Sequence, residues 1–248
     1  RIVVHPDNPN LVYVGALGHA YAPQKERGLF MSDDGGISWK HTLYIDDNTG
    51  ISDIVMDPNN SRVLFAGAWQ LKLKTWIRVS GGPGSGIFKS TDGGLSWEKL
   101  KDNGLPKKDV GKIALAMTPA SPDRLYALIE TGDGVPYEGE ETESGELWRS
   151  EDNGKTFKLI NSNRELGSRQ AYYTRTTASP DNANEVYFIS YRFFSSIDGG
   201  VSLENRSQLS SPNWDHHEMW IDPSNGDRMA VAGDGGISIS QNRGKSWL

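Results

Sequence analysis

The sequence predicts an all-β fold assembled from one repeated unit. Three observations predict it: an eight-residue pattern that occurs five times, a spacing of 44–60 residues between the copies, and the same succession of short apolar strands and tight turns around each copy. The pattern is Ser-x-Asp-x-Gly-x-Ser/Thr-aromatic. Its copies lie at 32–39, 90–97, 150–157, 196–203 and 240–247, so their serines are 58, 60, 46 and 44 residues apart. This spacing suits four strands per repeat, which is typical of the blades of a β-propeller. We therefore expect a β-propeller with five four-stranded antiparallel blades.

The pattern has the chemistry of a tight hairpin. We expect the Asp side chain to accept hydrogen bonds from backbone N–H groups one and two residues further on, while the Gly takes the positive φ that reverses the chain. The Ser/Thr hydroxyl closes the turn, and the aromatic residue begins the returning strand as an apolar anchor. Two copies depart from the pattern, because Asn242 replaces the Asp of the fifth and Leu203 replaces the aromatic residue of the fourth.

The elements follow in the same order within every repeat. In the first, the predicted strands are 1–4, 11–16, 28–32 and 38–43, with a Pro-Asn turn over 5–10. The corresponding first and second strands of the later repeats are 51–56 and 63–66, 112–117 and 125–128, 172–177 and 186–189, and 217–221 and 229–232. Pro and Asn or Asp in the first turns end the strands sharply. The predicted blades are 1–46, 47–105, 106–165, 166–210 and 211–248 within one domain over 1–248. A two-sheet sandwich is the alternative, but a fixed four-strand motif fits radial repetition better.

Closure of the propeller has two interpretations. The sequence starts with Arg1 in a first strand and stops at Leu248 inside a fourth. The chain is either a compact five-bladed ring or an excerpt of a larger propeller, and the missing Met and the abrupt finish favour the excerpt. We therefore expect further blades or a second domain as partners of this chain.

The repeated pattern resembles the Asp-box (BNR) repeat of sialidases, xyloglucanases, sortilin-type receptors and a photosystem assembly factor. All of these are β-propellers, and the resemblance covers essentially the whole chain. It is nearest to large bacterial Asp-box proteins with sortilin-like propellers, through segments 18–19, 26–28, 46–57, 82–86 and 216–223. That resemblance implies a protein exported to the periplasm, the cell surface or the medium, without fixing an activity.

Sialidases would show an early Arg-Ile-Pro and a triad of arginines that holds the sugar carboxylate. Here Arg1-Ile2 is followed by Val3, and the triad is only loosely suggested by Arg78, Arg169 and Arg175. Xyloglucanases use a cleft between two propellers, and this chain contains at most one.

The composition excludes several classes of partner and site. The net charge of −6, with no run of Lys or Arg, argues against a nucleic acid or an anionic membrane as partner. The absence of Cys excludes disulfides and thiolate metal sites. No apolar run approaches the roughly 20 residues of a membrane helix, so we expect no membrane span.

Functional residues are expected on one rim of the propeller. An antiparallel meander sorts the Pro-Asn turns and the Asp boxes onto one rim. The blade-to-blade connections and the long, varied loops, among them 18–27 and 69–86, lie on the other rim. Long, diverse loops on a rigid scaffold usually carry binding. We therefore expect a glycan, peptide or protein ligand at the second rim, over the mouth of the central channel. The predicted ligand-binding residues are His19, Tyr21, Asp53, Trp69, Trp76, Arg78, Tyr172, Tyr173, His216 and His217.

A glycoside hydrolase is the alternative function. Such enzymes need two carboxyl groups about 5–10 Å apart. Asp53, near the start of an inner strand, is one candidate, and Asp47 or Asp215 is its possible partner. The alternative role of Asp53 is a buried cap for amides between blades. A third function is a structural or assembly propeller, which predicts a large apolar patch on the outer surface of a blade.

No metal or other cofactor is expected. His216 and His217 precede Glu218, but adjacent strand residues point to opposite faces, so both imidazoles cannot reach one ion. The acidic run over 132–145 is interpreted as a solvated loop, with a weak calcium site as the alternative. The glycine-rich segment 81–86 lacks the Lys-Ser/Thr ending of a phosphate-binding loop and is interpreted as a flexible loop base.

Overall fold

A computed structural model describes residues 1–19, 21–131, 145–167, 170–207 and 215–248. The chain forms two compact units, Arg1–Leu115 and Ala116–Leu248. No helix in the described ranges is long and apolar enough to cross a membrane.

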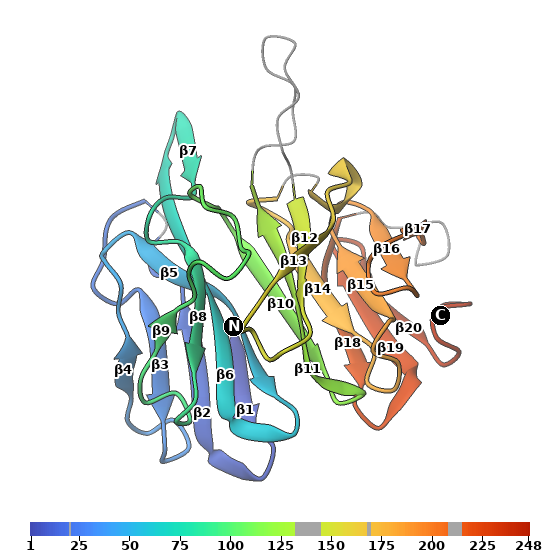
Figure 1. The fold of residues 1–248 in the computed structure, drawn as a ribbon, viewed down its shortest axis with the longest axis horizontal. Helices are drawn as coiled ribbons and strands as arrows, with labels where there is room; N and C mark the ends of the chain where they lie inside the picture. The colour runs from blue at the N-terminus through green and yellow to red at the C-terminus, as the bar shows by residue number, and fades with distance from the viewer. Residues whose placement is uncertain (20, 132–144, 168–169, 208–214) are drawn as a thin grey trace. The chain divides into compact units, whose positions relative to one another are not determined.

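The first unit contains two antiparallel sheets (Figure 1). The first sheet has the order β1-β2-β3-β4, with β1 over Ile2–His5, β2 over Asn8–Ala16, β3 over Gly28–Ser32 and β4 over Lys40–Leu43. The second has the order β5-β6-β8-β9, with β5 over Thr49–Asp57, β6 over Asn60–Lys74, β8 over Gly86–Ser90 and β9 over Glu98–Lys99. A further strand, β7 over Ile77–Ser80, pairs with the far end of β6.

The remaining strands form three more sheets. Strand β10, over Ile113–Thr118, contains the boundary between the units and begins the sheet β10-β11-β12-β13, with β11 over Ser121–Glu130, β12 over Gly145–Ser150 and β13 over Lys158–Asn161. After the short 3₁₀ helix η1 (Arg164–Gly167) comes the sheet β14-β15-β16-β17, over Arg175–Ala178, Val186–Ile189, Phe193–Ser196 and Glu204–Asn205. The last sheet has β18 over His216–Asp222, β19 over Asn225–Gly233 and β20 over Gly236–Ser240.

This succession of antiparallel meanders confirms the predicted fold class, an all-β chain with the five blades of a β-propeller. The last sheet has three strands, and the chain then begins a fourth, because Ile239 and Leu248 exchange backbone hydrogen bonds of 3.0 and 2.9 Å.

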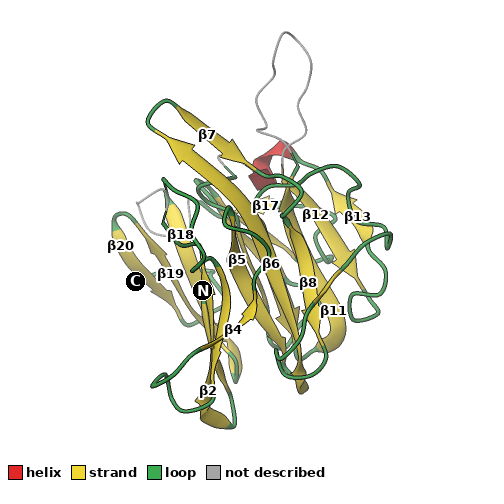
Figure 2. Cartoon of the chain, turned by 90° about the vertical axis from the view of Figure 1, so that its left-hand side faces the viewer, coloured by secondary structure: helices red, strands yellow, loops and turns green. Residues whose placement is uncertain are grey.

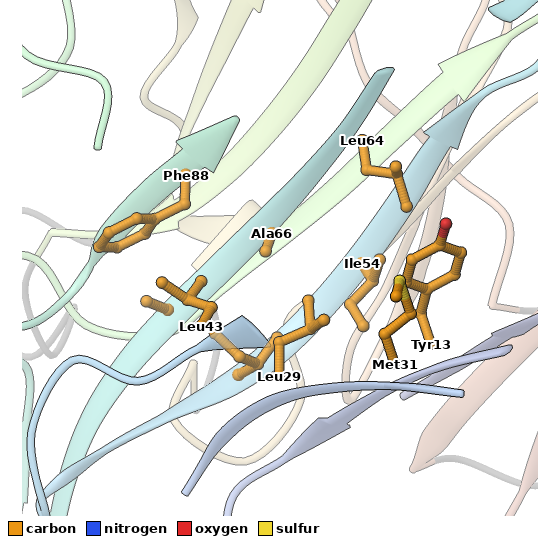
Figure 3. Close-up of a cluster of buried hydrophobic side chains, with 10 residues drawn as sticks. Tyr13, Leu29, Met31, Leu43, Ile54, Leu64, Ala66 and Phe88 are labelled. Carbon is orange, nitrogen blue, oxygen red and sulfur yellow. The ribbon is translucent and has the colours of Figure 1, made fainter. Parts of the chain in front are cut away.

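Apolar side chains fill the space between neighbouring sheets within each unit. In the first unit, Tyr13, Leu29 and Met31 of the first sheet meet Ile54 and Leu64 of the second (Figure 3). All five are buried. In the second unit, a comparable cluster joins the sheets β14–β17 and β18–β20 through Tyr187, Ile189, Phe193, Met219, Ile221, Met229 and Val231. Burial of two opposed apolar faces is what aligns one blade with the next.

The Asp boxes close the hairpins before the outer strands, through a bond pattern that differs from the prediction. In the second box, Asp92 accepts hydrogen bonds from the N–H groups of Leu95 and Ser96, both at 3.0 Å, which lie three and four residues on rather than one and two. The Asp92 carboxylate also accepts hydrogen bonds from the hydroxyls of Ser90 (2.7 Å) and Ser96 (2.5 Å). The Ser90 hydroxyl in turn accepts the N–H of Gly94 at 2.8 Å. These hydrogen bonds hold the pKa of Asp92 well below its ordinary value, and the bond from the Ser96 hydroxyl has the largest effect.

Every box also places two successive residues in the left-handed region. Asn153 and Arg243 take the first of these positions in the third and fifth boxes, with φ of 57° and 60°. Glycine occupies it in the other three. The predicted positive φ at the pattern's Gly is thus confirmed, and it extends to the residue before it.

Two predictions about individual elements are wrong. The segment after Trp69 was expected as a long loop, but β6 continues to Lys74 and turns back as β7 (Figure 2). Tyr172 and Tyr173 were expected in a strand, but β14 begins at Arg175, because the backbone of Thr174 has a φ of 38° that a strand cannot contain.

Candidate binding sites

A buried arginine organises the loop end of the first unit. The Arg27 side chain is 2% exposed. Its guanidinium donates to the carbonyl oxygens of Asn48 (2.8 Å), Leu71 (3.1 Å), His19 (2.7 Å) and Ala22 (3.3 Å). Burial lowers the pKa of Arg27 from its ordinary value, but a guanidinium stays protonated in proteins. The cation therefore ties the 17–27 loop to the start of β5 and to β6.

The glycine-rich segment 81–86 is held in the same region rather than being a flexible loop base. Gly82 forms a β-bridge with Val110, and the N–H of Gly84 donates to Gln70 Oε1 at 3.0 Å. A side chain on Gly84 would meet the Thr49 hydroxyl at 2.1 Å, so only glycine fits there. The segments that carry the resemblance around residues 18–28, 46–57 and 82–86 thus lie together.

The predicted ligand-binding residues of the first unit divide by exposure. Tyr21 is 65% exposed and Trp76 is 79% exposed, and His19 and Arg78 are also exposed. Trp69 is 4% exposed, donates from its indole to the Ser80 hydroxyl at 2.9 Å, and packs as a structural residue.

Asp53 is buried, at 2% exposure, and is occupied by donors. Its Oδ2 accepts the N–H of Leu115 at 2.9 Å, and its Oδ1 accepts the N–H of Ile54 at 2.9 Å. Arg1 Nε lies 3.2 Å from the same Oδ1. Asp53 thereby joins β5 to β10, which is the capping role that the sequence left open as the alternative to a catalytic carboxylate.

In the second unit, several predicted residues come together at the ends of β18 and β19. The rings of Tyr172 and Tyr173 meet edge to face at 4.9 Å between centroids, and the His217 ring lies 5.6 Å from Tyr172 and 5.3 Å from Tyr173. The Tyr173 hydroxyl donates to Asp215 Oδ1. His217 Nε2 lies 2.7 Å from Asp234 Oδ1. We call these five residues the Tyr-His cluster.

The Tyr-His cluster combines an open aromatic face with fixed polar groups. Tyr172 is 59% exposed, whereas Tyr173 is buried. The side chains of His217 and Asp234 are 37% and 68% exposed. The two carboxylate residues are neighbours, because the N–H of Asp234 donates to the carbonyl of Asp215 at 3.2 Å. An aromatic ring beside oriented hydrogen-bonding groups is a common design of small-molecule sites.

His216, next to a register irregularity of β18 that spans His217, is buried, whereas the side chain of His217 is partly exposed. His216 is 2% exposed and packs near the Phe193 ring, with centroids 5.9 Å apart. Burial lowers the pKa of His216. Within the described ranges, no three His, Asp or Glu side chains gather as a metal site would require.

Some predicted residues lie outside the described part of the chain: the acidic run over 132–144, Arg169 and the residues just before Asp215. Sequence reasoning missed Asp234 and the role of Arg27. Asp234 could have been found from the turn Gly233-Asp234-Gly235-Gly236. This turn lies at a hairpin tip next to the strand that contains His217, which brings the Asp234 carboxylate to the end of that strand.

Comparisons with known proteins agree with this fold. Residues 30–41 match the family described as BNR/Asp-box repeat, and residues 147–160 match the BNR-Asp box repeat. The chain contains Asp-box repeats and has a β-propeller fold. No curated protein sequence matches it.

Solved structures similar to this Asp-box propeller include an ancestral GH74 enzyme, at 19% identity over 96% of the chain with a TM-score of 0.61. The GH74 xyloglucanase from Xanthomonas campestris is similar at 17% identity over 99% of the chain, also with a TM-score of 0.61. YCF48 from Cyanidioschyzon merolae is similar at 14% identity over 97% of the chain and 66% of its own length, with a TM-score of 0.53. The chain spans 29% and 36% of the lengths of the two GH74 chains. Identities this low establish the likeness of fold alone.

Proposed function

We propose that this Asp-box propeller is a carbohydrate-binding protein whose second unit holds a sugar ring at the Tyr-His cluster. The observation that carries the proposal is the exposed Tyr172 ring beside the His217–Asp234 pair. A sugar ring offers an apolar C–H face and a rim of hydroxyl groups, and therefore suits an aromatic plate bordered by hydrogen-bonding groups.

Each residue has a distinct part in this site. Tyr172 stacks on the sugar, and the ring of Tyr173, buried beneath, fixes its position edge to face. Asp234 orients the imidazole of His217, which leaves the rest of the carboxylate to accept a sugar hydroxyl. A xyloglucanase is among the solved proteins of similar fold, and its activity belongs to a chain of which this one spans about a third.

A glycoside hydrolase is the second candidate, and one observation favours it. Asp215 and Asp234 are joined through their backbones, so two carboxyl groups border the same aromatic cluster. One is bonded to a tyrosine hydroxyl and the other to an imidazole, which gives them unlike surroundings, as an acid and a base or nucleophile require. Under this glycoside hydrolase hypothesis, Asp234 has the catalytic carboxylate role that the sequence analysis assigned to Asp53.

The test is a glycan array followed by titration calorimetry with the best oligosaccharide, with xyloglucan oligosaccharides included. Tyr172→Ala should weaken binding about tenfold, the loss expected for one stacking ring. The matched control is Trp220→Ala, which removes a 53% exposed ring from the same strand as His217 and should leave affinity unchanged. Unchanged affinity in Tyr172→Ala would refute the site.

The same samples separate binding from hydrolysis. Release of reducing sugar by the wild type that disappears in Asp234→Asn would establish the hydrolase. Retained substrate without release would support the binding protein.

Export is part of the proposal. It rests on the resemblance to exported Asp-box proteins. Fractionation of the source cells should find the protein in the periplasm, at the surface or in the medium, and a purely cytoplasmic pool would contradict it.

A further inference from the structure

The far end of β6 and strand β7 form a two-stranded hairpin over residues 71–80, which we call the arm. Pairing of β6 with β5 ends at Gln70, and pairing with β8 ends at Ala68. From Leu71 to Lys74, β6 pairs with β7 alone, and β7 pairs with β6 alone among the described strands. Figures 1 and 2 both show this arm extending beyond β5 and β8. A two-stranded ribbon is marginal by itself and offers a strand edge to another chain.

The side chains of the arm are not those of a simple solvated hairpin. Trp76 at the turn is 79% exposed, and Ile77 and Val79 on β7 are 49% and 45% exposed. Directly opposite these two aliphatic residues on β6 are Lys74 and Lys72. One face of the ribbon therefore combines two cations with two aliphatic side chains, and the Lys74 ammonium lies 5.5 Å from the centre of the Trp76 ring.

The arm is also the centre of a strongly basic stretch in an acidic protein. Residues 58–91 contain five Lys or Arg and no Asp or Glu, while the whole chain has a net charge of −6. No ion pair joins Lys72, Lys74 or Arg78 to a carboxylate within the described ranges. Lysines on an edge strand discourage self-association, but they do not account for three exposed apolar side chains beside them. Both features fit a partner of opposite charge.

We propose that the arm binds an extended acidic segment of a partner protein, which adds to the edge of β7 as a further strand. Backbone hydrogen bonds to β7 supply affinity, and alternate side chains of the segment supply specificity. Apolar residues of the segment lie beside Ile77 and Val79 on one face of the added strand, and its carboxylates lie beside Arg78 on the other face. The two lysines add long-range attraction to the acidic segment. The residues of this surface belong to the first unit, whereas those of the proposed sugar site belong to the second.

The experiment uses the whole chain and a fluorescent peptide that alternates glutamate with valine, followed by anisotropy at low salt. Binding should be seen for this peptide and not for one that alternates lysine with valine. The same acidic peptide, N-methylated at every residue, keeps its charges but loses its backbone donors on both edges, and its affinity should fall at least about tenfold.

Charge reversal maps the surface. The Lys74→Glu/Arg78→Glu variant should weaken binding at least about tenfold, and Trp76→Ala should weaken it several-fold. The control is Lys101→Glu/Lys107→Glu, which makes the same change in net charge at exposed lysines elsewhere in the first unit and should retain most of the affinity.

Three results would overturn the proposal: no binding of the acidic peptide, equal binding of its N-methylated form, or equal losses in the two double variants. Binding to vesicles that contain phosphatidylserine, without binding to the peptide, would identify the arm as a lipid contact instead.

Discussion

Replacing Asp152 by alanine measures what one Asp box contributes to stability. Asp152 accepts hydrogen bonds from the Ser150 hydroxyl (2.8 Å), the Thr156 N–H (2.8 Å) and the Thr156 hydroxyl (2.6 Å). Hydrogen bonds to a charged group contribute about 1.5–3 kcal/mol each when buried. Thr156 is exposed, so its freed donors regain water, and the loss should resemble that of a helix cap, about 1–2 kcal/mol. For a protein of this size that lowers the melting temperature by about 2–8 °C, measurable by circular dichroism.

The fifth box supplies the matched control, because it already contains an amide. Asn242 Oδ1 accepts the Ser246 N–H at 2.9 Å, and its Nδ2 donates to the Ser246 hydroxyl at 2.8 Å. Asp152→Asn should therefore keep the turn and cost less than half as much as Asp152→Ala. Equal destabilisation by the two substitutions, or no effect of the alanine, would refute this account of the turn.

The pH dependence has a definite sign. Burial acts to raise the pKa of Asp152, but hydrogen bonds from Thr156 and Ser150 outweigh it and lower the pKa to about 2. A lowered carboxyl pKa stabilises the folded state above the ordinary value near 3.8, and this stabilisation is lost as the pH falls toward 2. Asp152→Asn should remove that part of the acid sensitivity, so the gap between variant and wild type should narrow as the pH falls through this window.

Three further predictions concern buried residues. Asp53→Ala should cost about 3 kcal/mol in thermal unfolding, because it removes the partner of a buried amide and of an arginine; a loss of glycan hydrolysis with unchanged stability would instead make Asp53 catalytic. Gly94→Ala should cost about 1–3 kcal/mol, since its φ is 83° and the new Cβ would lie 2.6 Å from the Tyr13 ring. Gly93→Ala, with a φ of 80° and open space, should cost less in the same melts. His216→Phe should flatten the loss of stability on acidification below about pH 6.5, because burial keeps this imidazole neutral while the unfolded chain gains a proton; parallel pH profiles would contradict this.

The repeated turn could be predicted from the sequence because its chemistry is local. Serine, aspartate and glycine at fixed offsets specify a bend whatever surrounds them, and five copies specify the blades. The hydrogen-bond partners of Asp92 were harder to predict from the sequence. They depend on two successive residues in the left-handed region, and the pattern specifies a glycine at only one of these positions.

The candidate sites could be predicted only in part, for two physical reasons. The alternation Leu71-Lys72-Leu73-Lys74 is a strand signal, but exposed aromatic and basic residues also suit a loop, and the pairing partner lies across a two-residue turn. Burial could not be predicted from residue type either: an aromatic or acidic side chain near a strand end serves a ligand or a core equally well, and Trp69 and Asp53 are in the core.

The short reach of the Asp-box bonds has a consequence for engineering. The side-chain hydrogen bonds of the Asp or Asn at the third position of each box span no more than four residues, so these bonds do not depend on the loops at the other end of the strands. A designer can therefore lengthen, shorten or exchange those loops, the β6–β7 arm among them, and graft new recognition segments onto the scaffold. The Asp boxes would keep each strand pair in register.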